Sequence, residues 1–342
     1  MAMADITIRG AGIFGLTIAW EAVRRGARVR VIDPGGPGAG ASGGVVGALQ
    51  PHTPDVWNPK KQFQLESLLL ARELWPGVEA ASGLSTGYAQ AGRLQPLRGE
   101  RDVVLARARQ EAAQQRWGDA ATWRVIETDD TGPWRPPSAS GLYIHDTLSA
   151  LIHPAQAVKS LARALEVSGV PILTDGTDQG RVIWATGWQG LLDLNAALDR
   201  NVGAGVKGQA AVLRHNAAGS PQIYAESLHI VPHTNGTVAI GSTSESQFDY
   251  PTGTDALLDD IVTRARTILP ALANADVIAR WAGVRPRAKS RAPLLGPWPD
   301  RPGHYVANGG FKIGFGMAPK VAVTICDLVL DDRVTYPEDF AL

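Results

Sequence analysis

A chain of 342 residues is longer than one compact core usually holds, so it predicts two domains or one large discontinuous arrangement. Lys plus Arg and Asp plus Glu each total 33, and this balance argues against nucleic acid or an anionic membrane as the main partner. The single cysteine, Cys326, excludes an internal disulfide and fits a reducing compartment. We find neither an export signal nor an apolar run of about 18 residues, so we expect a cytoplasmic protein without a membrane span.

The start of the chain predicts a βαβ unit. Residues 5–9 are typical of a short strand, residues 16–25 have apolar side chains at helical spacing, and residues 27–32 are typical of a second strand. A glycine-rich turn separates the first strand from the helix. This order of elements favours a dinucleotide-binding site.

Three glycines in that turn have separate physical roles. Gly10 permits the tight turn, Gly12 lets the backbone approach a pyrophosphate, and Gly15 lets the helix pack closely on the strand. The free N–H groups at the start of the helix attract phosphate. Asp33 follows the second strand and suits a ribose hydroxyl, which disfavours the 2′-phosphate of NADP but leaves NAD and FAD both open.

The rest of the chain alternates between helical and strand-like segments. The glycine-rich run at residues 35–44 directly follows the acid of the nucleotide unit, so we interpret it as a phosphate-contacting loop rather than a linker. Residues 229–242 predict a β-hairpin turned by Asn235-Gly236. Further helices are predicted at residues 62–74, 103–116, 154–166 and 255–268 and from Pro319 onward, and further strands at 170–173, 181–184 and 304–307.

Five segments together resemble the D-amino-acid oxidase, glycine oxidase and sarcosine oxidase family of FAD-dependent oxidoreductases, and glycine oxidase-like members most closely. These segments are residues 5–33, 40–47, 182–187, 283–296 (Gly-Val-Arg-Pro followed by Pro-Leu-Leu-Gly) and 308–319. Any one segment is a weak signal. Their order and spacing along the whole chain favour a true relationship.

The resemblance implies an α/β (α+β overall) fold, with a Rossmann-like FAD-binding domain that is discontinuous in sequence and an antiparallel-sheet substrate domain. Residues 1–84, 149–200 and 276–342 are assigned to the FAD domain, and residues 85–148 and 201–275 to the substrate domain. The FAD is expected to be non-covalent, because no cysteine stands where some relatives attach it. The implied cofactor-binding residues are Gly10, Gly12, Ile13, Phe14, Gly15, Asp33, Ser42, Gly43, Val46, Gly47, Val182, Ala185, Thr186, Gly187, Gly310, Lys312, Ile313 and Gly314.

Three further residues are candidates for substrate contact. In the family, the arginine of the Gly-Xaa-Arg-Pro segment pairs with the substrate carboxylate, and Arg285 occupies that place. Lys312 stands where glycine oxidase-like members often have arginine, and His229 stands where relatives have tyrosine. The alternatives are a structural ion pair for Arg285, a solvated lysine and a structural histidine. If it contacts substrate, His229 would have a charge that responds to pH.

The implied function is oxidative deamination or N-dealkylation of a small amine or amino acid by hydride transfer to the flavin. Oxygen is the expected electron acceptor and hydrogen peroxide the by-product. A same-fold dehydrogenase that passes electrons to a quinone or carrier stays open, and so does a catalytically silent flavoprotein module. No metal, nucleic acid or membrane is expected, and the oligomeric state is left open.

Overall fold

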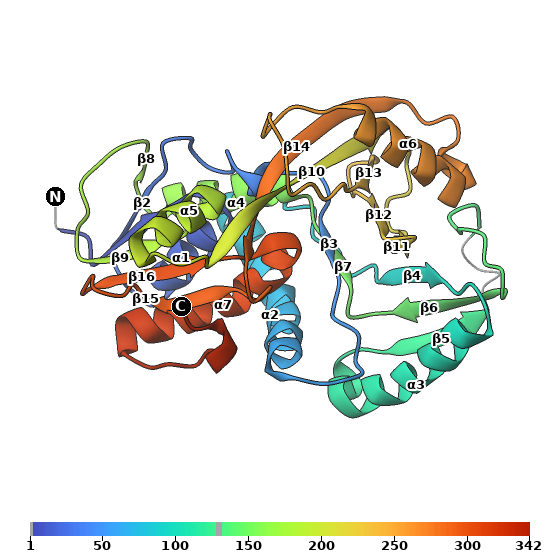
Figure 1. The fold of residues 1–342 in the computed structure, drawn as a ribbon, viewed down its shortest axis with the longest axis horizontal. Coiled ribbons are helices and arrows are strands. Elements are labelled where there is room, and N and C mark those ends of the chain that lie inside the picture. Colours follow the sequence, from blue (N-terminus) through green and yellow to red (C-terminus); the bar gives the residue numbers. More distant parts are fainter. Residues whose placement is uncertain (1–2, 128–131) are drawn as a thin grey trace.

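Strands from distant parts of the chain assemble into two main β-sheets, each at the centre of one lobe (Figure 1). The computed structural model describes residues 3–127 and 132–342. The mixed α/β fold predicted from the sequence is confirmed.

The first lobe contains a six-stranded sheet with the order β15-β16-β9-β1-β2-β8. All neighbouring strands are parallel except β15 and β16, which are antiparallel. The strands are β1 (Ile6–Arg9), β2 (Val29–Ile32), β8 (Ile172–Leu173), β9 (Arg181–Trp184), β15 (Leu294–Pro297) and β16 (His304–Asn308). Segments near both ends and the middle of the chain therefore meet in one Rossmann-like sheet.

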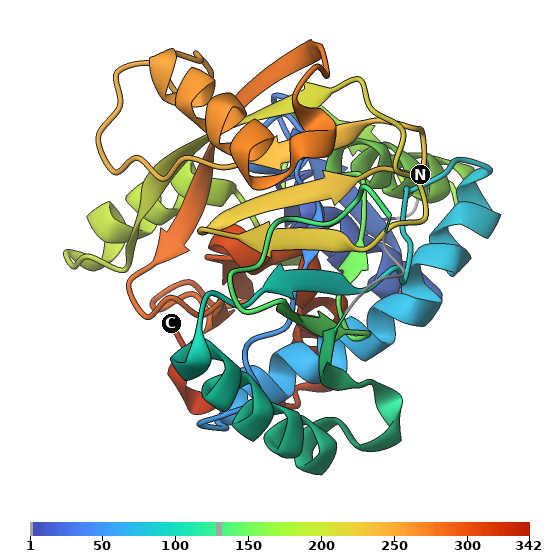
Figure 2. The ribbon, with the colours of Figure 1, turned by 90° about the vertical axis from the view of Figure 1, so that its right-hand side faces the viewer.

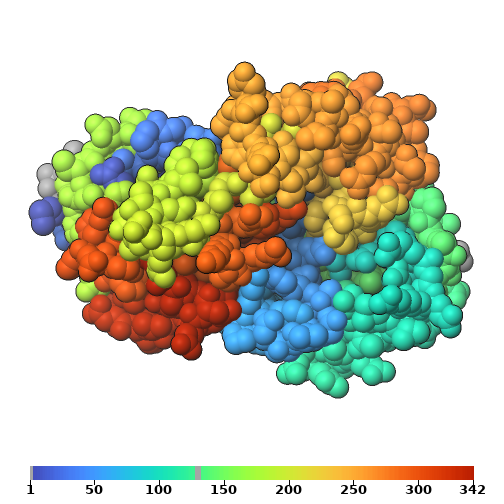
Figure 3. Space-filling view, in the orientation of Figure 1, coloured from blue at the N-terminus to red at the C-terminus, as the bar shows by residue number. Residues whose placement is uncertain are grey.

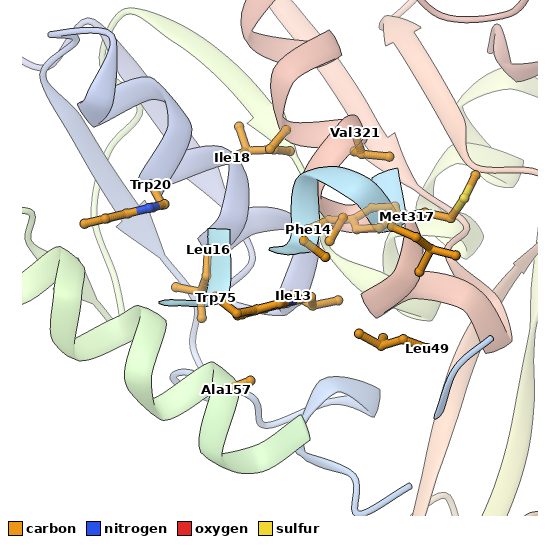
Figure 4. Close-up of a cluster of buried hydrophobic side chains, with 14 of the residues drawn as sticks. Ile13, Phe14, Leu16, Ile18, Trp20, Leu49, Trp75, Ala157, Met317 and Val321 are labelled. Carbon is orange, nitrogen blue, oxygen red and sulfur yellow. The ribbon is translucent and has the colours of Figure 1, made fainter. Parts of the chain in front are cut away.

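Five helices pack around this sheet and on one another. They are α1 (Ile13–Arg24), α2 (Pro59–Ser82), α4 (Pro154–Val167), α5 (Gly187–Leu198) and α7 (Gly314–Asp331). Ile13 and Phe14 of α1 lie beside Met317 of α7 in the buried core of the lobe (Figure 4). The two helix starts that carry the glycine-rich segments are thus held together by apolar packing.

The second lobe contains an eight-stranded sheet with the order β14-β10-β13-β12-β11-β4-β6-β5 (Figure 2). Only the β4–β11 pair is parallel. The strands are β4 (Arg93–Pro96), β5 (Trp123–Glu127), β6 (Leu142–Asp146), β10 (Gly203–Leu213), β11 (Gln222–Ala225), β12 (Leu228–Pro232), β13 (Val238–Gly241) and β14 (Val277–Ala288). Helix α6 (Ala256–Ile268) packs on β10, β12 and β13, and α3 (Glu100–Trp117) packs on β5.

A two-stranded sheet of β3 (Ala48–Leu49) and β7 (Ala150–Leu151) lies between the lobes. Val231 and Ala239 of the large sheet pack against this region. The short 3₁₀ helices are η1 (Ala41–Gly43), η2 (Gly118–Ala120), η3 (Pro270–Leu272), η4 (Phe311–Ile313) and η5 (Glu338–Phe340).

Strand β14 differs from the expected division of the chain. Residues 276–342 were assigned to the FAD domain, but β14 is the edge strand of the eight-stranded sheet and pairs along its length with β10. The reason is that the backbone of Val277–Ala288 pairs with Gly203–Leu213 of β10 before the chain returns to the first lobe at β15. Arg285 therefore belongs to the large sheet.

Two predicted elements have different boundaries. The last helix begins at Gly314 rather than Pro319, so Pro319 lies inside it, and packing of Met317 in the core beside α1 stabilises the turn before it. The hairpin is present, but His233 N–H donates to Thr237 C=O across a longer loop. Only Gly236 of the Asn-Gly pair has a positive φ, of 79°, so the loop is not the tight two-residue turn.

By length and composition alone, one helix of the described residues, Phe311–Asp331, is long and apolar enough to cross a membrane, with a mean hydropathy of 1.6 over its most apolar window. In the structure, 67% of its most apolar window is buried inside the protein. Helix α7 packs against α1 and α2, which accounts for its apolar surface.

Candidate active site

A cavity of about 630 Å³ lies where segments of the two lobes meet. The space-filling view shows the surface hollowed between the two lobes (Figure 3). The wall is formed by residues from 9–14, 32–48, 184–193, 281–286 and 307–316, with Pro154, Ala210 and Ser242. The segments that carry the sequence motifs therefore converge on one space.

At one end of the cavity, the glycine turn leaves no room for side chains. A Cβ on Gly10, whose φ is 109°, would lie 2.3 Å from the carbonyl oxygen of Ala185. A Cβ on Gly15 would lie 1.9 Å from the carbonyl oxygen of Gly10. Both distances are far below van der Waals contact, so the close approach of α1, β1 and β9 requires glycine at these positions.

Asp33 and Ser42 hold the backbone of this turn. Asp33 accepts hydrogen bonds from the N–H groups of Ala11 at 2.7 Å and Gly35 at 2.9 Å. Ser42 Oγ accepts from the N–H of Ile13 at 2.9 Å. Because a carboxylate offers about four lone-pair positions, Asp33 keeps acceptor capacity for a ligand hydroxyl.

Most of the predicted cofactor-binding residues line the cavity. These are Gly10, Gly12, Ile13, Phe14, Asp33, Ser42, Val46, Gly47, Ala185, Thr186, Gly187, Gly310, Lys312 and Gly314. Gly15, Gly43, Val182 and Ile313 do not line it. Gly15 and Val182 are buried behind the wall, and a Cβ on Gly43 would lie 2.3 Å from the carbonyl oxygen of Gly38. Gly15 and Gly43 therefore support the shape of the wall rather than form its surface.

Arg285 projects from β14 to the cavity wall. Its Nη2 donates to Ser242 Oγ at 2.6 Å and its Nη1 donates to the carbonyl oxygen of Thr243 at 3.3 Å. Burial lowers the pKa of Arg285 to about 10, and nearby Glu245 acts in the opposite direction. The guanidinium stays charged at neutral pH, and both hydrogen-bond partners are uncharged.

Lys312 lies on the same wall in η4. An antiparallel bridge joins Arg287 to Gly310, which brings η4 beside the part of β14 that carries Arg285. Burial and the positive charge of Arg285 both lower the pKa of Lys312. Two cationic side chains therefore face one region of the cavity.

His229 lies on β12, and its ring centroid is 4.8 Å from that of Tyr224. It is not part of the cavity wall. Burial, with repulsion from Arg93, Lys312 and Arg285, lowers the pKa of His229 to about 3. Protonation would place a fourth cation beside these three, so His229 is neutral near neutral pH.

Three residues without an assigned role also have defined positions. The backbone N–H of His52 donates to Gln64 Oε1 at 2.6 Å, and the His52 ring contacts the same oxygen. His153 caps the start of α4, with its ring centroid 4.4 Å from that of His233. Ser244, which follows β13, is exposed and does not line the cavity.

The sequence analysis missed three tryptophans on the cavity wall, Trp184, Trp188 and Trp281. A Cβ on Gly44 would lie 3.3 Å from the indole of Trp281, so this ring bridges β14 and the glycine-rich segment. The signal was present, because Trp281 and Arg285 are four residues apart on one strand and so share a face.

A family model described as FAD dependent oxidoreductase matches residues 5–328. Glycine oxidase of Geobacillus kaustophilus is 26% identical over 95% of this chain and 92% of its own length. The putative thiamine biosynthesis oxidoreductase ThiO of Rhizobium etli is 27% identical over 96% of this chain and 97% of its own length. The chain spans about half, 52%, of the bifunctional protein ThiO/ThiG of Synechocystis sp., to which it is 28% identical.

Solved structures have the same fold over nearly the whole chain. The crystal structure of glycine oxidase from Geobacillus kaustophilus matches with a TM-score of 0.87 at 21% identity, covering 99% of this chain and 98% of that one. L-proline dehydrogenase from P. horikoshii matches with a TM-score of 0.81 at 21% identity, covering 99% and 97%. At these identities the likeness concerns the fold alone.

Proposed function

The chain belongs to the FAD-dependent oxidoreductase family, and from that premise we propose that it oxidises a small amine or amino acid. Oxygen is the proposed electron acceptor, with hydrogen peroxide as the by-product. The similarity to glycine oxidases over almost the full length supports an amino-acid substrate. The observation that carries the proposal is the half-buried, charged Arg285 on the wall of the shared cavity.

The residues present fit FAD at the glycine-turn end of the cavity. Gly10 permits the close approach of the turn to β9, and at Gly12 a Cβ would lie only 3.2 Å from Ser42 Oγ, so the missing side chain leaves the backbone of Gly12 accessible. The N-terminus of α1 offers N–H groups and a partial positive charge to the phosphates. Asp33 would accept from a ribose hydroxyl. FAD is a dinucleotide, and these groups match its diphosphate and ribose.

Arg285 is the proposed anchor for a substrate carboxylate. A guanidinium forms two parallel hydrogen bonds with a carboxylate, and its burial strengthens this interaction. Ser242 and Thr243 fix the direction in which the guanidinium points. Lys312 adds a second positive charge without the fork geometry. These side chains would orient the substrate and would take no part in the bond changes.

When bound, FAD supplies the oxidant that takes a hydride from the carbon next to the substrate nitrogen. The chain's part is to hold the carboxylate at Arg285 and Lys312 and to surround the reacting carbon with Trp188 and Trp281, which limits the access of water. The substrate reacts with its amine neutral. The product imine then hydrolyses in water to a carbonyl compound and an amine or ammonia.

Replacement of Arg285 by alanine tests the anchor. We expect kcat/KM for carboxylated substrates to fall about 30-fold or more, since removing one partner of a desolvated charge pair costs about 2–5 kcal/mol. FAD content should stay at the wild-type level. Arg280→Ala is the matched control, because Arg280 is an exposed residue of the same strand that pairs with Asp259. Unchanged kinetics in Arg285→Ala would remove this assignment.

Anaerobic titration of the holoprotein with glycine, sarcosine, D- and L-amino acids and simple amines tests the substrate class. Bleaching of the flavin absorbance by at least one of them is the expected result. Peroxide formation in air then separates an oxidase from a dehydrogenase that uses a quinone or carrier. If no amine reduces the flavin, the proposed amine oxidation is wrong and a silent flavoprotein module becomes the better account.

A further inference from the structure

Two glycines face each other across β10 and β14 beside Arg285. Gly208 of β10 pairs with Gly283 of β14, and Arg285 pairs with Val206. Side chains alternate between the two faces of a strand, so Gly208 and Arg285 share the face that contributes Ala210 to the cavity.

The guanidinium of Arg285 occupies the space that a side chain at position 208 would need. A Cβ on Gly208 would lie 2.0 Å from Nη2, 2.1 Å from Nη1 and 2.2 Å from Cζ of Arg285. All three atoms belong to the planar head group. The head group therefore folds back onto the backbone of β10 at Gly208, instead of extending from β14.

The backbone of Gly208 does not itself need glycine, because Gly208 is not among the residues with positive φ. Glycine inside a strand weakens it and usually marks a close approach by another group. The neighbouring side chains of Lys207 and Gln209 point to the opposite face, where they bind Glu245 and Asp255. At Gly208 the group that approaches the backbone closely is the guanidinium of Arg285.

We propose that Gly208 is a positioning residue for Arg285. The missing side chain lets the guanidinium lie over β10, where Ser242 and the carbonyl of Thr243 accept its hydrogen bonds while it faces the cavity. A methyl group at position 208 displaces a flexible side chain, not backbone. In Gly208→Ala the guanidinium of Arg285 is therefore displaced, while the pairing of β10 with β14 is retained. The inference rests on the proposed role of Arg285 in binding carboxylate.

A double-mutant cycle with acetate as the ligand tests this contact. Acetate is titrated into FAD-loaded wild type, Gly208→Ala, Arg285→Ala and the double variant, and binding is followed by the change in flavin absorbance. Gly208→Ala should weaken acetate binding by about fivefold or more, and in the Arg285→Ala background the same change should alter it by less than about twofold. FAD content and the thermal midpoint are measured in parallel and should stay near wild type.

The possible outcomes separate the two proposals. Wild-type acetate affinity in Gly208→Ala, or an equal loss with and without Arg285, overturns the positioning role alone. Acetate binding that is absent in wild type or unaffected by Arg285→Ala removes the anchor and the positioning role together. If Gly208→Ala folds poorly, recovery in the double variant identifies the clash with Arg285 and supports the proposal, whereas no recovery assigns Gly208 to strand packing and overturns it.

Discussion

The imidazole of His229 is neutral in the folded protein because burial and three cations, Arg93, Lys312 and Arg285, lower its pKa to about 3. In the unfolded chain its pKa is about 6.5. Between these values the unfolded state binds more protons, so acidification from about pH 6.5 towards 3 destabilises the fold. His229→Asn should remove one proton from this dependence, a slope of about 1.4 kcal/mol per pH unit. Thermal midpoints measured from pH 4 to 7 give the slope, and an unchanged slope would contradict the assignment.

The sequence predicted which residues are candidates for the site, but it did not predict their protonation state or the position of their side chains. The resemblance of the Gly-Val-Arg-Pro segment to the family identified Arg285 as a candidate, and the fit of a guanidinium to a carboxylate agrees with it. The protonation state of His229 depends on cations from β4, β14 and η4 that surround it only in the folded chain. The contact of the Arg285 guanidinium with Gly208 likewise depends on the register of β10 and β14, which the sequence did not predict.

At the scale of elements, the packing of α1 on the first turn depends on Gly15. A Cβ there would lie 1.9 Å from the backbone oxygen of Gly10, which cannot move as a side chain can. Gly15→Ala should therefore lower FAD occupancy and cost about 1–3 kcal/mol of stability. The control is Gly77→Ala in α2, where a Cβ meets nothing within 4 Å and alanine favours the helix by about 1 kcal/mol. FAD content after purification and thermal midpoints measure both effects, and full occupancy in Gly15→Ala would contradict the prediction.

The periodicity of apolar residues predicted whether most elements are helices or strands, but it did not predict the residues at which they begin and end. Helix α7 starts at Gly314 because apolar packing of Met317 against α1 stabilises a turn that Pro319 suggested was absent. The hairpin was correctly predicted, yet its loop uses the positive φ of Gly236 alone. In both cases contacts outside the local segment determine the boundary.

At the scale of the molecule, the cavity wall combines residues from position 9 to position 316. The discontinuous FAD half was predicted by resemblance, because no local pattern states that the chain leaves the first lobe and returns to it. Strand β14 shows the limit of that inference, since a stretch assigned to the FAD domain pairs with β10 of the other sheet. Arg285 thereby connects the two sheets at the cavity.

Such a wall makes the stability of the whole molecule depend on FAD. A ligand that binds only the folded state at 100 times its Kd stabilises that state by about 2.7 kcal/mol. Removal of FAD should therefore lower the thermal midpoint, and added FAD should raise it with the logarithm of concentration. ADP is the matched probe, because it reaches only the groups around Gly12 and Asp33 and should raise the midpoint less than FAD. If the thermal midpoint does not depend on FAD, the two lobes hold this wall together without the cofactor. If ADP raises the midpoint as much as FAD does, the stabilising contacts of FAD lie at the glycine-turn end and not at the Arg285 end.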